Sequence, residues 1–179
     1  MTQNRLPWEN MSAMHHQPDG AAFDIVLLLH VGCAVVGLVT TVAAAATATR
    51  LRRLHRASTP LPEPLRRYFR PGVNWAGRTI YGIPVFGLAL LAMSRGAYAL
   101  GDGWVLAGVA LFAAVALLGE GVLWPAERRL QAAVAAAGPP TAQLPGTGSV
   151  EGEARLMMWS ASAALVLLIA GMVVMVAQP

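Results

Sequence analysis

The sequence predicts an all-α membrane protein, a four-transmembrane-helix bundle whose N-terminus and C-terminus both lie on the outer side. Of its 179 residues, 56% are hydrophobic and only 12% are charged, whereas a soluble domain carries about 25% charged residues. The apolar residues gather in four long runs, as membrane-spanning helices require. Eight of the thirteen basic residues lie between the first two runs. Because short cytoplasmic loops keep an excess of Lys and Arg, this segment is predicted to face the cytoplasm.

A polar N-terminal segment, residues 1–22, precedes the transmembrane domain, residues 23–179. A secretory signal has a basic start and a short apolar core. Here a polar stretch comes first and the apolar run that follows is longer, so the segment is predicted to be retained. The first span is predicted over residues 23–49. Asp24 lies at its start and Arg50 follows it, which orients the chain from outside to inside.

Small side chains recur at every fourth position of the first span. They are Cys33, Gly37, Thr41, Ala45 and Thr49. Such a ridge lets a neighbouring helix approach closely. The competing interpretation is that an Ala-rich helix presents small residues on every face, so that the ridge has no special role.

Within the first inner loop, residues 50–78, Pro60, Pro62 and Pro64 alternate and disfavour a helix, which predicts an extended arm at these prolines. On either side, RLRRLHR and LRRYFR mix arginine with Leu, Tyr and Phe, a pattern typical of short amphipathic turns in the headgroup layer. Seven arginines of this loop are candidates for contact with anionic lipids such as cardiolipin, or with a partner protein. They are Arg50, Arg52, Arg53, Arg56, Arg66, Arg67 and Arg70.

Three further spans complete the predicted bundle. The second runs over residues 79–100 if Arg95 snorkels outward, or ends at Met93, and Pro84 within it predicts a kink. The third covers residues 104–124, where Pro125 is expected to stop it. The second inner loop, residues 127–155, opens as a short amphipathic helix and continues as a flexible linker rich in Gly and Pro. The fourth span covers residues 157–177.

The remaining arginines agree with this topology at each crossing. Arg128, Arg129 and Arg155 fall in the second inner loop, whereas Arg95 alone falls in the outer loop. The positive-inside bias therefore places both termini outside.

Glu120 is the single acid of the third span, and Arg78 lies at a similar depth at the inner end of the second. An ionisable group within a span is costly unless it is paired. The sequence therefore predicts a structural ion pair between Arg78 and Glu120. The functional alternative is a proton-carrying carboxylate, but a relay needs further titratable groups, and the middle of spans two to four has none.

A copper site in the outer leaflet is the second hypothesis. His30 and Cys33 share one face of the first span, and the fourth span brings Met172 and Met175 to the same leaflet, where the second ends at Met93. Imidazole, thiol and thioether ligands suit Cu(I). The polar N-terminal segment adds further candidates: Met11, Met14, His15 and His16.

The competing interpretation of these residues is structural. Methionine fills apolar gaps, and His30 bonds a backbone carbonyl. Since His30 is the one histidine within a span, a bis-His haem site within this chain is excluded and only a His30–Met pair remains. We expect no cofactor, with copper as the alternative.

Motifs of catalysis are absent from the sequence, which has no glycine-rich phosphate loop, no HExxH, no CxxC and no nucleophile elbow. The single cysteine excludes an intrachain disulfide. We therefore expect a protein that is not an enzyme. The basic residues flank apolar runs, which favours anionic headgroups over nucleic acid as their partner.

The motif LLLHVGCAVVG, the arginine-rich first inner loop and the WP-x-ER-R turn resemble a family of small bacterial integral membrane proteins of unknown function. They are also distantly similar to copper-resistance D type membrane proteins. The Lys-free, Arg- and Ala-rich composition resembles that of actinobacteria, where a small four-helix protein of this kind is similar to the association factor of the cytochrome bc–aa3 oxidase supercomplex. The resemblance implies a multi-pass accessory subunit of the respiratory chain in the bacterial plasma membrane. Copper delivery is the alternative function, and a small transporter is the third.

Overall fold

The computed structural model describes residues 20–138 and 148–177, and within them every regular element is helical. Four helical segments are long and apolar enough to cross a membrane, and they cover Ala21–Arg56, Trp75–Met93, Gly103–Ala136 and Gly148–Val176. The predicted all-α, multi-pass membrane fold is confirmed at this level. The side of the membrane on which each terminus lies stays a prediction.

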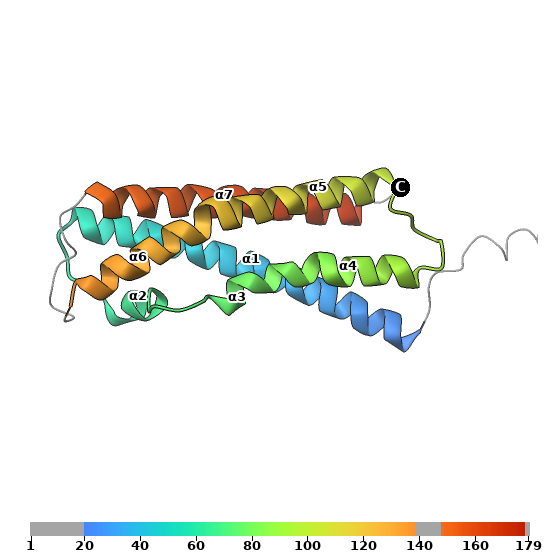
Figure 1. Cartoon of the computed structure of the whole chain (residues 1–179), viewed down its shortest axis with the longest axis horizontal. Coiled ribbons are helices and arrows are strands. Elements are labelled where there is room, and N and C mark those ends of the chain that lie inside the picture. The colour runs from blue at the N-terminus through green and yellow to red at the C-terminus, as the bar shows by residue number, and fades with distance from the viewer. Residues whose placement is uncertain (1–19, 139–147, 178–179) are drawn as a thin grey trace, which may run out of the picture.

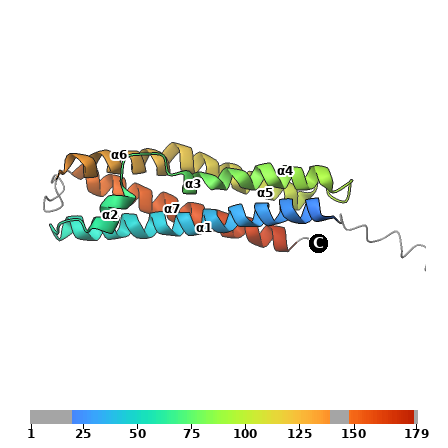
Figure 2. The ribbon, with the colours of Figure 1, turned by 90° about the horizontal axis from the view of Figure 1, so that it is seen from below.

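The elements follow one another as an antiparallel bundle (Figure 1). They are α1 (Ala21–Arg56), α2 (Glu63–Tyr68), α3 (Trp75–Arg78), the 3₁₀ turn η1 (Thr79–Tyr81), α4 (Gly82–Met93), α5 (Gly103–Leu118), the π-helical turn η2 (Gly119–Leu123), α6 (Trp124–Ala136) and α7 (Gly148–Val176). The start of α1, the end of α7 and the α4–α5 connection lie at one end, which we call the open end (Figures 1 and 2). The end of α1, α2, α6 and the start of α7 form the other end, which we call the arginine-rich end.

The hydrophobic core lies towards the arginine-rich end. Within α1 the buried residues begin at Gly37, and within α7 they end at Leu168. The largest fully buried side chains all belong to the arginine-rich half: Leu51, Phe69, Leu130 and Met157. Apolar side chains of the open end are instead exposed on the chain's own surface, where lipid or another protein covers them in a membrane.

The prolines lie in a non-helical stretch, residues 59–62, followed by the short helix α2, but the predicted projecting arm is wrong, because this segment is folded onto the bundle. Helix α1 continues without a break to Arg56, and Leu61, Leu65 and Phe69 around α2 are buried. Pro60 and Pro62 stay outside a helix, as predicted, whereas Pro64 lies within α2. Pro62 is the extended N-cap of α2 and Pro64 occupies the first turn, where an N–H has no intrahelical partner and its loss costs nothing.

The predicted stop at Pro125 is also wrong. The chain passes from α5 through η2 into α6 as one helical segment. Pro125 lies in the first turn of α6, where its missing N–H would interrupt regular α-helical bonding. The π turn just before it shifts the hydrogen-bond pattern by one residue, so the helix continues. The predicted inner loop is thus helical to Ala136 and again from Gly148, and most of the predicted flexible linker falls on residues 139–147, outside the described residues.

The second span takes the shorter of the two predicted lengths. Helix α4 ends at Met93, and Arg95 and Gly96 follow with positive φ angles of 52° and 89°, which terminates the helix as at many C-caps. Near Pro84, the 3₁₀ turn η1 interrupts the α-helical pattern directly before α4 begins. The predicted irregularity is therefore present, one turn earlier than Pro84 itself.

The ridge of small residues on α1 is a contact surface within the chain. A Cβ atom added to Gly37 would lie 2.7 Å from Cγ2 of Ile80. One added to Gly82 would collide with Sγ of Cys33. The ridge thus receives η1 and the start of α4, and it is not available to another protein at these positions.

Candidate functional site

Arg78 and Glu120, the predicted ion pair, lie together at the boundary between the apolar spans and the arginine-rich end. Nη1 of Arg78 donates to Oε1 of Glu120 at 3.3 Å. The Tyr81 hydroxyl donates to the same oxygen at 2.9 Å. The Arg78 guanidinium carbon also lies 4.4 Å from the centroid of the Trp124 ring, within the range of a cation–π interaction.

Local structure explains why these groups meet. Glu120 lies in the π turn and Trp124 begins α6 directly after it. Arg78 ends α3, which begins at the N-cap Asn74, whose side chain accepts from the Gly77 amide at 3.1 Å. The side chains of Arg78 and Glu120 are 29% and 52% exposed. The pair therefore neutralises two charges at the membrane boundary without burying either of them fully.

Proton transport from this site would need a continuation across the membrane. The described residues of α4, of α5 and of α7 beyond Arg155 contain no carboxylate and no imidazole. The contacts of Glu120 with Arg78 and Tyr81 join the second span to the third, as the structural interpretation expects.

The copper candidates pack against different helices. Nδ1 of His30 lies 2.9 Å from the carbonyl oxygen of Ile83 on α4. Because a carbonyl only accepts, Nδ1 carries a hydrogen in this contact. Cys33 also packs on α4, at Gly82, whereas the Met175 methyl packs on Gly108 of α5.

These contacts are those of the structural interpretation, in which His30 bonds a backbone carbonyl and methionine fills a gap. Met172 is 38% exposed. Within residues 20–138 and 148–177, no three His, Cys, Asp or Glu residues are grouped as metal ligands. The candidates Met11, Met14, His15 and His16 lie outside the described residues. Copper binding stays a prediction.

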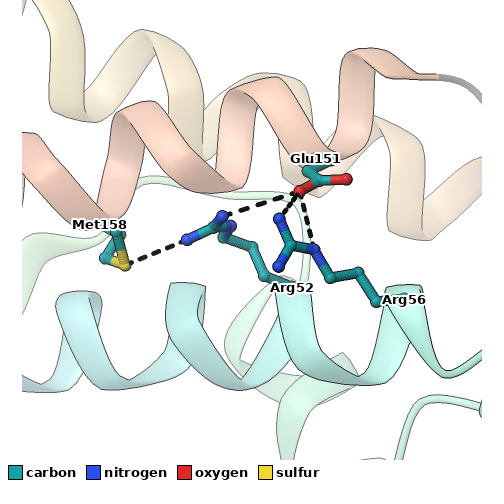
Figure 3. A network of polar contacts seen from close by, with 4 residues as sticks. All are labelled: Arg52, Arg56, Glu151 and Met158. Atoms are coloured by element: carbon teal, nitrogen blue, oxygen red, sulfur yellow. Dashed lines mark hydrogen bonds and ion pairs between the residues drawn. The ribbon is translucent and has the colours of Figure 1, made fainter.

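Two of the seven arginines predicted to contact lipid or a partner bind α7 (Figure 3). Nε of Arg56 donates to Oε1 of Glu151 at 2.8 Å, and Nη2 of Arg52 lies 3.7 Å from the same oxygen. Nη1 of Arg52 also donates to Sδ of Met158 at 3.5 Å. These contacts join the last turns of α1 to the first turns of α7.

The other five arginines of the set differ in their surroundings. Arg66 donates to the carbonyl oxygen of Gly138 at the end of α6, at 2.7 Å, and Arg67 lies 4.0 Å from Glu63 on its own helix. Arg50, Arg53 and Arg70 are exposed and form no ion pair with any described residue. The predicted contact with lipid or partner therefore fits these three best.

A buried polar cluster around Glu127 was not predicted. Glu127 on α6 is only 5% exposed and accepts from Nδ2 of Asn74 at 3.2 Å. One turn further, Gln131 is 7% exposed and donates to the carbonyl oxygen of Gly72 at 3.3 Å. Burial raises the pKa of the Tyr68 phenol, and the negative charge of Glu127 adds to the shift, so this hydroxyl keeps its proton.

A sequence signal for this cluster does exist. Glu127 and Gln131 fall on the helical stripe of buried apolar positions that holds Leu123, Leu130 and Val134. Polar residues on an apolar stripe indicate buried hydrogen bonds. From the sequence, Glu127 is only the first residue of the amphipathic helix predicted for the second inner loop, beside Arg128 and Arg129.

Comparisons with protein-family models, with curated proteins and with solved structures give no match to this chain. Function is therefore inferred from the clusters and surfaces of the chain itself.

Proposed function

We propose that this protein is a non-catalytic accessory subunit that associates laterally with a larger integral membrane complex. The observation that carries the proposal is the incomplete packing of the open end. Helix α4 packs on α1 and η1, and α5 packs on α7, but α4 and α5 do not pair extensively with each other. In a closed four-helix bundle each helix packs against two neighbours.

The surface left by this arrangement is apolar and accessible. No residue of α4 is buried within the chain, and Val85 and Leu88 are 62% and 53% exposed. On α5, Leu106 and Val109 are 55% and 52% exposed. Helices associate in a membrane through close packing and not through the hydrophobic effect. Helix faces that lack a partner within the chain are therefore suited to packing against helices of another subunit.

The arginine-rich end supports the same function from the predicted cytoplasmic side. Arg50 and Arg53 are exposed one turn apart on α1, near the end of the apolar run. Each arginine near an anionic membrane surface contributes about 1 kcal/mol of binding energy. Anionic lipids such as cardiolipin are the proposed ligands of this surface, which would hold the subunit at the lipid border of a complex.

The cytochrome bc–aa3 oxidase supercomplex is the partner to test first, because the sequence resemblance points to it. Purification of the tagged chain from native membranes in a mild detergent should co-isolate large membrane subunits, identified by mass spectrometry. Recovery of a lone monomer, under conditions in which the respiratory supercomplex itself stays intact, would contradict association with it. Recovery with other membrane subunits would retain the accessory function and replace the partner.

Copper handling is the competing function, and the observation in its favour is that His30 bonds the carbonyl of Ile83 through Nδ1, so that Nε2 is not used by this bond. Elemental analysis of the purified chain decides between the two. Stoichiometric copper that is lost in both His30→Ala and Met172→Ala would favour copper handling, whereas copper at background level would leave accessory function as the better account.

A further inference from the structure

A small cavity, partly open to the surface, lies beside the buried Glu127. Its volume is about 20 Å³, and its polar lining comes from Thr40, Thr41, Tyr68, Asn74 and Glu127. Apolar residues of η1, α5 and α7 complete its lining, among them Ile80, Val115 and Ala164. The cavity therefore lies where the spans meet the segment that returns from α2.

The hydrogen-bonding groups around the cavity are not all satisfied by one another. Oε1 of Glu127 accepts from Asn74, and the Thr41 hydroxyl donates to the carbonyl oxygen of Gly37 at 2.7 Å. The Thr41 oxygen thus keeps its capacity to accept. The Tyr68 hydroxyl is buried and has no hydrogen-bond partner among the described residues. A buried hydroxyl without a partner is costly, and an ordered water molecule is the common remedy.

The dimensions fit one water molecule and nothing larger. A water site needs about 10–15 Å³ of probe-occupied volume and two to four polar partners. The cavity exceeds that volume and offers a phenol donor, a carboxyl group and a threonine oxygen. We propose that this cavity is a hydration site in which one water molecule bridges the Tyr68 hydroxyl and the Glu127 carboxyl group.

The bridge holds the arginine-rich segment in a defined position on α6. Tyr68 ends α2, and Gly72 and Asn74 belong to the loop that leads into α3. Asn74 bonds Glu127 of α6 directly, and Gly72 bonds Gln131 of the same helix. Tyr68 bonds Glu127 through the water. The water thereby joins α2 to the polar stripe of α6. It also helps to hold Asn74 as the N-cap of α3, on which the position of Arg78 depends.

The Tyr68→Phe variant tests the proposal, because a bridged hydroxyl and an unbridged one predict changes of Tm in opposite directions. Removing a bridged hydroxyl leaves the water and Glu127 short of a donor and should lower Tm by about 2–4 °C in detergent. Removing a hydroxyl without a partner relieves a desolvation cost, so an unchanged or higher Tm would overturn the proposal. Tyr98→Phe, at a half-buried tyrosine near the open end, is the matched control and should leave Tm unchanged.

Two further measurements keep the proposal testable if one variant folds poorly. In a Glu127→Met background the loss from Tyr68→Phe should disappear, since one end of the bridge is already gone. An equal loss in that background would contradict the bridge. An experimental map of the unmodified protein should show a water peak within hydrogen-bond distance of the Tyr68 oxygen, and a well-ordered cavity without that peak would also refute it.

Discussion

At the residue scale, the contacts of Glu120 explain how a lone carboxylate is tolerated at the end of a span. One oxygen accepts from both Arg78 and Tyr81, and the guanidinium in turn lies over Trp124. Each interaction is modest because both charged side chains are partly exposed. Together they fix the relative rotation of the second and third spans at the membrane boundary.

Substitution of Arg78 by Ala should lower the free energy of unfolding by about 1–2 kcal/mol, the sum expected for an exposed ion pair and a cation–π contact. The folded yield of the purified protein should fall accordingly. Adding Glu120→Gln should restore part of the loss, since the amide no longer leaves an unpaired charge. Titration with a denaturing detergent measures the free energy of unfolding of both variants. A double variant no more stable than Arg78→Ala would reject the pairing.

At the element scale, helix packing depends on two close approaches of α1 to the second span. Gly37 meets Ile80 of η1, and Cys33 meets Gly82 at the start of α4. The contacts occur at successive ridge positions one turn apart, so the two segments approach closely over at least one helical turn.

Gly37→Val should therefore destabilise the protein by about 1–3 kcal/mol through overpacking against Ile80. The control is Gly32→Val, because a Cβ at Gly32 would meet nothing within 4 Å. Both variants place the same branched side chain in α1, so their difference reports the contact and not helix propensity. Equal melting temperatures for the two variants would show that the close approach does not occur.

The folded arginine-rich end makes a separate element-scale prediction. Phe69 is fully buried after α2, and replacement by Ala should cost about 3–5 kcal/mol of packing. Because the damage is local, α2 should open before the spans separate. Limited trypsin digestion should then cut after Arg66 or Arg67 much faster than in the unmodified chain. Equally fast cutting of both proteins would indicate that this segment is open in solution.

At the scale of the whole molecule, the sequence predicts the spans well because composition and length determine them. Four runs of about 20 apolar residues leave no other fold class. The pairing of Arg78 with Glu120 could also be predicted from the sequence, since the two charges lie at a similar depth in the second and third spans. The course of the segments between the spans could not be predicted, because Pro64 and Pro125 break or start a helix depending on the hydrogen bonds around them. The Glu127 cluster depends on Tyr68 and Asn74 and so needed the tertiary structure.

The orientation of the whole molecule follows from its arginines and is directly testable. In a Cys33→Ser background, Ala57→Cys lies at the arginine-rich end and Ala97→Cys in the α4–α5 connection, and both positions are exposed. The positive-inside rule predicts that an impermeant thiol reagent labels residue 97 in intact cells and residue 57 only after permeabilisation. The reverse pattern would place both termini in the cytoplasm.

Lateral association through the open end is the central claim, and site-specific photo-cross-linking in native membranes tests it most directly. A photoreactive residue at Val85 of α4 is compared with one at Val166 of α7, since these valines are 62% and 66% exposed. We expect a discrete, heavier protein product from position 85, dependent on irradiation, and little or none from position 166. Products at both positions that contain only lipid or the chain itself would contradict the claim.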